Sequence, residues 1–285
     1  MARVGAQSLL RYLLTHPTGF SINRTGQGLV MNKLLLATIA IVALASGGAS
    51  AADLEYKAPP PERHCGGGPF QGIYLGIHGG GVNYTANRSD QDAFLGGGIF
   101  TSPATFSNTS SSGLVGAQAG YNYQCRNAVF GIEVDGSWMQ ATSTFRMFPN
   151  LGAPESKVVS KLDGIATARA RAGIVAADSL LLYVTGGVAA VHTDTTWSVV
   201  FPGIGPGNAD IAAFKEWNWG WVAGFGAEWS FFSSRLSLRS EVLYVGLVDR
   251  QYTATSLFVG GPVTFTHSDS IWMAKIGANI RLTTD

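Results

Sequence analysis

The stretch WMAKIGANIRL, from Trp272 to Leu282, decides the fold because its two alternating faces differ in polarity. Every second residue from Trp272 to Leu282 is apolar, whereas the intervening positions hold Met, Lys, Gly, Asn and Arg. Residues i and i+2 share one face of a β-strand. A helix would instead spread these charges around its circumference. The pattern therefore predicts a β-strand with one apolar face and one largely polar face.

Upstream, the same alternation recurs in seven further segments. It is regular in five of them and weaker in the first and the fifth. The segments are 71–82, 112–124, 128–139, 161–176, 180–193, 217–230 and 235–247. They exceed the roughly five or six residues of a mean soluble strand. They also suffice to cross a membrane at a tilt, for which about 9–11 residues are needed.

The connections between these segments alternate between long and short. The long connections are 84–111, 140–160, 194–214 and 248–267, and the short ones are 124–127, 177–179 and 230–235. Long extracellular loops and short periplasmic turns are typical of transmembrane barrels, whereas a Greek-key sandwich would not alternate so strictly. The sequence therefore predicts an all-β, eight-stranded antiparallel transmembrane β-barrel with both termini in the periplasm.

Aromatic residues support this interpretation because they fall at two levels of the predicted wall. The periplasmic level holds Tyr121, Tyr123, Phe130, Trp229, Phe231 and Phe232, and the extracellular level holds Trp138, Trp219, Tyr244 and Trp272. Two aromatic girdles flanking an apolar band are expected of membrane barrels. A general preference of aromatics for strands does not predict two levels.

Composition fits the same class. Only 13% of the 285 residues are charged, against roughly 25% in a soluble domain. No apolar run reaches the about 18 residues that a membrane helix requires. The formal net charge of +1 argues against a nucleic-acid partner, because proteins that bind nucleic acids carry a basic patch or stripe.

The N-terminal region indicates export. Residues 31–51 resemble a signal peptide: Lys33 precedes an apolar run from Leu34 to Ala45, and an Ala-Ser-Ala cleavage site follows. The apolar run is too short for a membrane anchor. Residues 1–30 are then interpreted as a mis-called upstream extension, the alternative being a genuine extended n-region. Residues 52–69 form a Pro/Gly-rich periplasmic linker, and residues 70–285 form the barrel domain.

Several short motifs in this order and spacing are similar to one protein family. They are the Ala-Ala-Asp-Leu start with its Pro run at 51–61, Gly72–Gly76, Gly116–Tyr123, Gly131–Glu133, Ala168–Gly173, Leu182–Gly187, Gly224–Trp229 and Lys275–Arg281. Together they resemble the RopB-type outer-membrane proteins of alphaproteobacteria, a porin-family or OmpA-like group. The resemblance spans about residues 51–282 and implies an outer-membrane barrel.

Charged side chains on the predicted inward faces form the main candidate site. The acids are Glu133, Asp135, Asp163, Glu228 and Glu241, and the bases are Arg169, Arg171, Arg239, Lys275 and Arg281. Adjacent strands allow the acids at 133 and 135 to pair with the bases at 169 and 171. An eight-stranded barrel is just wide enough to be filled by its own side chains. The sequence favours a structural salt-bridge network over a catalytic carboxylate pair or an ion path.

Histidines offer a second, weaker site. His192 and His267 lie at predicted extracellular loop bases and are candidates for binding haem or a metal, although no paired ligand spacing supports this. The alternative is that both are solvated or hydrogen-bonded, and no cofactor is expected. The adjacent residues His267, Ser268 and Asp269 do not suggest a triad, because consecutive strand residues point to opposite faces.

Two cysteines, Cys65 and Cys125, are the whole complement. In an exported protein an even pair suggests a disulfide. Cys65 precedes the first strand and Cys125 ends the second, so a bond would pin the linker to the periplasmic end of the barrel. The alternatives are two free thiols or an intermolecular link.

These observations favour a structural, non-enzymatic outer-membrane barrel that supports the envelope and displays surface loops. The alternatives are a small-solute porin and a haem-binding surface protein that acts through its loops. The expected partners are outer-membrane lipids, lipopolysaccharide and the outer-membrane assembly machinery. The oligomeric state stays open.

Overall fold

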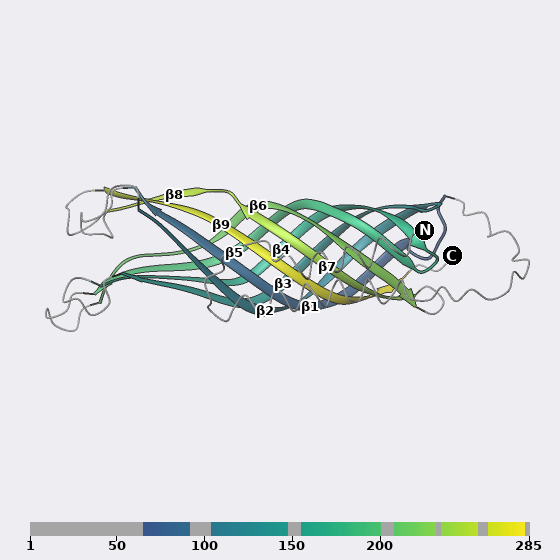
Figure 1. Cartoon of the computed structure of the whole chain (residues 1–285), viewed down its shortest axis with the longest axis horizontal. Helices are drawn as coiled ribbons and strands as arrows, with labels where there is room; N and C mark the ends of the chain where they lie inside the picture. The colour runs from purple at the N-terminus through teal and green to yellow at the C-terminus, as the bar shows by residue number, and fades with distance from the viewer. Residues whose placement is uncertain are drawn as a thin grey trace, which may run out of the picture.

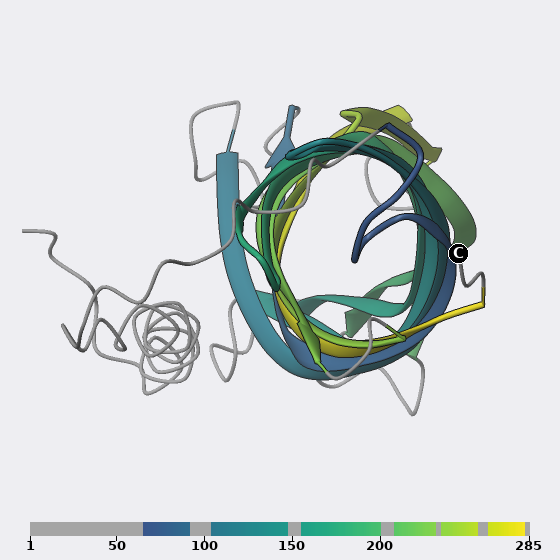
Figure 2. The same cartoon turned by 90° about the vertical axis from the view of Figure 1, so that its right-hand side faces the viewer.

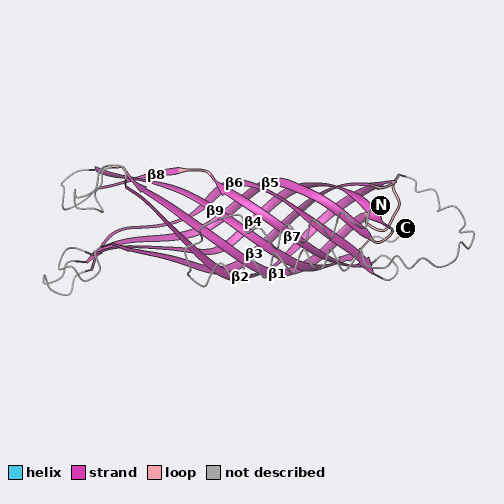
Figure 3. Cartoon of the chain, viewed as in Figure 1, coloured by secondary structure: helices cyan, strands magenta, loops and turns pink. Residues whose placement is uncertain are grey.

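The structure is a computed structural model of the whole chain and describes residues 65–91, 104–147, 155–200, 208–231, 235–255 and 262–282. The predicted upstream extension, the signal peptide and most of the linker lie outside the described residues, as do the tips of the four long connections. The described residues form strands, turns and short irregular segments (Figure 3). Among these residues, no helix is long and apolar enough to cross a membrane.

Nine strands form one antiparallel sheet that closes on itself (Figures 1 and 2). They are β1 (Gly72–Asp90), β2 (Ala104–Cys125), β3 (Ala128–Met147), β4 (Glu155–Ala177), β5 (Leu180–Val200), β6 (Asn208–Phe231), β7 (Leu236–Leu247), β8 (Arg250–Thr255) and β9 (Pro262–Arg281). Each strand pairs with the next along the chain as far as β7, and β9 closes the sheet by pairing with β1. Because β7 and β8 follow one another and both pair with β9, they share one position in the wall. The predicted eight-stranded antiparallel barrel is confirmed.

Most strands are longer than predicted. β2 begins at Ala104 rather than 112, and β6 begins at Asn208 rather than 217, so the predicted long connections overestimate the loops. The reason is that Ser-, Thr- and Asn-rich segments continue the hydrogen-bonded ladder beyond the apolar band, as in the pairing of Asn83–Asp90 with Ala104–Ser111. Both ends of the described chain lie at the same end of the barrel, since Tyr74 near the start of β1 is paired with Arg281 at the end of β9.

The outer face of the wall carries an apolar belt. On β1 the outward side chains are Ile73, Leu75 and Ile77, and Ile77 is 70% exposed. Exposed aromatics border the belt at both levels, including Tyr123 and Phe130 towards the short turns and Trp138 and Trp219 towards the long connections. So much exposed apolar surface is unusual for a soluble protein, but it matches the lipid-facing surface of a membrane barrel.

Candidate functional site

Glu133 is the centre of a charge network that fills the lower lumen, the part nearer the short turns. Arg169 on β4 donates to one carboxylate oxygen of Glu133. The side chain of Arg239 on β7 forms a bidentate pair with the same carboxylate, at 2.5 and 3.0 Å. Because β3 and β7 lie four positions apart in the wall, this pair spans the lumen from one side to the other.

Further ion pairs extend the network around the barrel. Lys275 donates to Asp135 at 2.7 Å, and Arg169 Nη1 donates to Glu241 at 2.8 Å. Arg171 forms an ion pair with Glu228 at 3.2 Å. The network thus contains four acids and four bases, each of them nearly inaccessible to solvent, namely Glu133, Asp135, Glu228, Glu241, Arg169, Arg171, Arg239 and Lys275.

Two tyrosines that were not predicted to belong to the network, Tyr74 and Tyr183, complete it. Tyr74 donates its hydroxyl to Glu133 at 2.6 Å and stacks under the guanidinium of Arg171 at 4.6 Å. Tyr183 donates to Glu241 at 3.3 Å. The wall makes room for Tyr74 at Gly120, where a Cβ would lie 2.2 Å from the tyrosine hydroxyl. The sequence signal for this inward tyrosine is a glycine at the paired position of the neighbouring strand.

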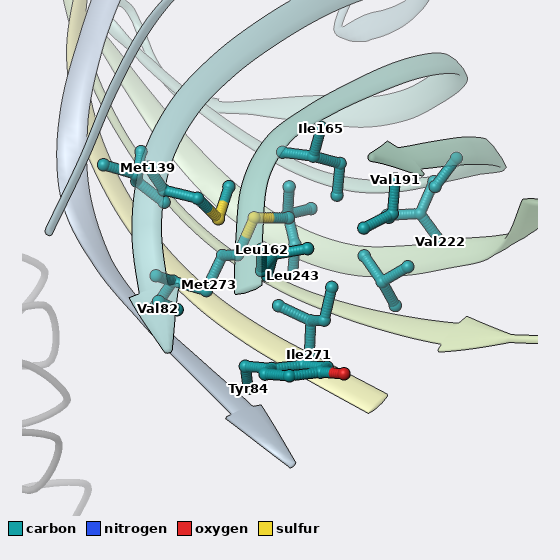
Figure 4. Packing of buried hydrophobic residues seen from close by; sticks show 14 of the residues in the cluster. Val82, Tyr84, Met139, Leu162, Ile165, Val191, Val222, Leu243, Ile271 and Met273 are labelled. Atoms are coloured by element: carbon teal, nitrogen blue, oxygen red, sulfur yellow. The ribbon is translucent and has the colours of Figure 1, made fainter. Parts of the chain in front are cut away.

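An apolar layer closes the lumen directly beyond the charge network. Leu162, Leu243, Ile271 and Met273 all point inward and are at most 1% exposed. They belong to one buried cluster of side chains from β1 to β7 and from β9 (Figure 4). This layer differs from the polar, charge-paired interior predicted from the sequence. Towards the long connections it is capped by Arg88, which forms a buried ion pair with Asp269.

Phe70 closes the opposite end, next to the short turns. It is 1% exposed and packs with Val129, Val175, Leu181 and Tyr183. Its backbone is held on both sides: its N–H donates to Gln124 Oε1 at 3.0 Å, and its C=O accepts from Asn122 Nδ2 at 3.0 Å. In Figure 2 the first described residues turn into the mouth of the barrel.

A disulfide anchors this segment. The structure joins Cys65 to Cys125 at the end of β2, and the N–H of Gly66 donates to the C=O of Gln124 at 2.9 Å. The segment that carries Phe70 is therefore attached covalently at one end and continues into β1 at the other.

Two residues that were predicted to belong to the lumen network do not join its ion pairs. The prediction was wrong for Asp163, whose side chain is 47% exposed and lies on the outer face. The pairing of β4 with both neighbours shifts register at this point, so that Leu162 and Ile165 point inward with two residues between them. Arg281 points inward but donates to Ser230 at 2.9 Å and lies over the ring of Phe70.

The two candidate histidines lie on opposite sides of the wall. His192 faces outward, where its Nδ1 contacts Asp163 at 2.6 Å and its ring packs on Trp217. His267 is buried inside, against the ring of Tyr252 at 4.7 Å. One haem or metal ion therefore does not reach both. In the described part of the chain no group of three or more His, Cys, Asp or Glu residues is placed to hold a metal ion.

Relatives agree with the exported barrel architecture. The chain is 29% identical over 234 residues to the 31 kDa outer-membrane immunogenic protein of Brucella melitensis, covering 77% of this chain and 89% of that protein. The Brucella suis protein of the same name matches equally. This protein is an outer-membrane β-barrel. No protein-family model matches the chain, and the more specific RopB-type resemblance stays a prediction.

Solved structures similar to this outer-membrane barrel are more distant in sequence. OprG of Pseudomonas aeruginosa is 14% identical with a TM-score of 0.46, covering 75% of this chain and 98% of that one. The outer-membrane protease OmpT of Escherichia coli is 7% identical with a TM-score of 0.42, covering 75% of this chain and 97% of that one. At these values the protease activity of OmpT carries nothing over to the present barrel.

Proposed function

We propose that this protein is a structural, non-conducting outer-membrane barrel that displays its long connections at the cell surface and is not an enzyme. The observation that carries the proposal is the filled lumen. Phe70, the charge network at Glu133 and the apolar layer at Leu162 occupy successive levels between one mouth and the other. An eight-stranded barrel is just wide enough for its interior to be filled by such side chains.

The charge network supports a structural role rather than a catalytic or conducting one. Each carboxylate contacts at least one base, and Glu133 accepts from Tyr74, Arg169 and Arg239 together. Removing one partner of a buried pair leaves an uncompensated charge, which is strongly unfavourable. The network therefore favours one closed arrangement of the strands.

Planar-bilayer recordings test whether the lumen is closed to ions. The wild-type protein is expected to give no stable conductance steps under conditions in which a general-diffusion porin does. A variant truncated at all three levels, Phe70→Ala/Glu133→Ala/Arg239→Ala/Leu162→Ala, is expected to leak. Lys215→Ala on the outer face is the matched control and should stay silent. A wild-type protein that conducts steadily contradicts the proposal and favours the small-solute porin.

Surface display is supported by the arrangement of the connections and by the name of the Brucella relatives, which describes them as immunogenic. The described chain has no free cysteine, so a single engineered thiol reports its own location. Thr105→Cys, at an exposed position of β2 next to a long connection, is expected to react with a membrane-impermeant maleimide on intact cells, whereas Asp178→Cys in a short turn is not. Labelling of the second variant alone would reverse the orientation and remove the display role.

A further inference from the structure

Beyond the apolar belt, the outward side chains that the structure describes are charged on one side of the barrel only. On β1 from Asn83 to Ser89, on β2 from Thr105 to Ser111 and on β9 from Thr264 to Ser270, the outward residues are all Asn, Ser or Thr. On β3 to β6 the outward residues at the same height include Arg146, Lys157, Lys161 and Lys215. We call these four residues the basic face.

The members of the basic face are neighbours across the sheet. Lys161 on β4 is paired in register with Asp194 on β5, which in turn is paired with Lys215 on β6. Arg146 on β3 is paired with Lys157 on β4. Lys215 remains 71% exposed although its Nζ contacts Asp194 at 3.3 Å.

The charge of this region is positive. The outward carboxylates among these residues are Asp163, which contacts His192, and Asp194. Among the side chains that the structure describes on this side of the wall, four cations against two carboxylates leave a net charge of +2. Most of these side chains contact solvent and lie outside the lumen network, so they contribute little to closing the barrel.

The position of the basic face along the barrel axis indicates which layer of the membrane it contacts. Trp217 and Trp219, both more than half exposed, mark the upper edge of the belt on β6. Lys215 lies two residues beyond Trp217, which is about 7 Å along a strand. The polar headgroup layer of a bilayer is about 5–8 Å thick on each side of the hydrocarbon core. Lys215 therefore lies at the level of the headgroups, and so does Lys161, which is paired with it through Asp194. Lys157 and Arg146 lie four residues further from the belt.

We propose that the basic face binds the phosphorylated headgroup of a glycolipid in the outer leaflet, the lipid A part of lipopolysaccharide. Ammonium groups bind phosphate oxygens as charge-assisted donors, and exposed tryptophans at the rim pack beside the first carbons of the acyl chains. The neutral wall of β1, β2 and β9 does not share this property. The barrel thus carries one preferred lipid contact on the side of β3 to β6.

Retention of lipid A by the purified full-length protein tests the proposal. The probe is diphosphorylated lipid A at a low mole fraction in phosphatidylcholine nanodiscs, with bound lipid counted by native mass spectrometry. Each lysine near an anionic lipid surface contributes about 1 kcal/mol, so Lys161→Gln/Lys215→Gln should weaken retention roughly 20- to 30-fold. The wild type should retain dephosphorylated lipid A poorly. This retention should match that of diphosphorylated lipid A by the double variant.

Two further variants separate charge from folding. Lys161→Arg/Lys215→Arg keeps both charges and should retain lipid A, and Asp194→Asn removes a neighbouring carboxylate and should strengthen retention. Arg126→Gln in a short turn at the opposite end is the matched control and should have no effect. Equal retention of phosphorylated and dephosphorylated lipid, or unchanged retention by the glutamine variant, overturns the proposal. Heat-modifiable gel mobility checks that each variant is folded.

Discussion

Two levels of the lumen, the charge network at Glu133 and the apolar layer at Leu162, fill the same barrel with opposite chemistry. The network lies behind a wall whose outer face is apolar, as at Ile132 and Val134. On β1 the apolar layer lies behind a wall whose outer face is polar, as at Asn83 and Thr85. On β6 and β9 the wall outside it still carries the exposed Trp221 and Trp272. At the upper edge of the belt a strand can therefore be apolar on both faces, and the outer face becomes polar only beyond that edge.

β1 shows this reversal within a single uninterrupted strand. Ile73, Leu75 and Ile77 point outward, whereas Val82, Tyr84 and Ala86 point inward and are at most 4% exposed. The register with β2 is continuous along the whole strand, so the strand does not rotate. The hydrophobic residues change sides because lipid surrounds the first half and water surrounds the second.

Removing the centre of the charge network is the largest perturbation that we expect. Glu133→Ala leaves Arg169 and Arg239 without their shared carboxylate, and breaking a buried ion pair in this way costs about 3–5 kcal/mol. The free energy of unfolding in urea, measured in detergent micelles or lipid vesicles, should fall by that amount.

A double variant distinguishes charge from packing at this site. Glu133→Gln/Arg239→Gln removes one charge of each sign and should recover part of the lost stability relative to Glu133→Gln alone. If Glu133→Ala unfolds at the wild-type urea concentration, the network contributes nothing and the comparison of the two levels fails.

Truncation in the apolar layer should have the next largest effect. Leu162→Ala removes a side chain that is 0% exposed, and such truncations cost about 2–5 kcal/mol by lost burial and cavity formation. The effect should not depend on salt or pH, in contrast to that of Glu133→Ala. An effect below about 1 kcal/mol would mean that the layer is loosely packed.

A moderate, pH-dependent effect is expected from His267, beyond the apolar layer. Burial, followed by the nearby Arg88 cation, lowers the pKa of His267 from 6.5 to about 3. Below its ordinary pKa the unfolded chain therefore binds a proton that the folded chain does not, and stability falls as the pH decreases through this window. At pH 5 the loss reaches about 2 kcal/mol.

The matched variant for this effect is His267→Gln, which cannot take up the proton. The difference in free energy of unfolding between pH 7.5 and pH 5 should be smaller for the variant than for the wild type by about 2 kcal/mol. Equal differences would mean that His267 becomes protonated inside the barrel without cost.

The sequence predicted the lower half of the barrel well because apolar residues point outward and polar residues point inward throughout it. In the belt every strand faces lipid, so inward residues such as Glu133, Arg169 and Lys275 follow directly from alternation. The same rule does not describe the upper half, where Leu162 and Ile271 are inward. Tyr74 was missed for a related reason: its inward position follows from the alternation, but its partner Glu133 lies two strands away in the wall.

Asp163 shows where alternation itself fails. Asp163 was predicted to point inward because the strict alternation of inward and outward residues was extended across a register shift. Such a shift adds one residue to one strand, and nothing in the local sequence apart from Gly164 marks it. The resulting outward position brings Asp163 to His192, a pair that alternation did not predict.

This correction yields the smallest effect, through a comparison of two aspartates that the sequence had placed on the same face. Asp163→Asn alters a partly exposed pair with His192, and exposed pairs contribute about 0–1 kcal/mol. Asp135→Asn, by contrast, leaves Lys275 and Arg169 short of a buried carboxylate. Urea unfolding should therefore distinguish the two variants by about 3 kcal/mol or more. Equal losses would return Asp163 to the lumen and remove the register shift on which its outward position depends.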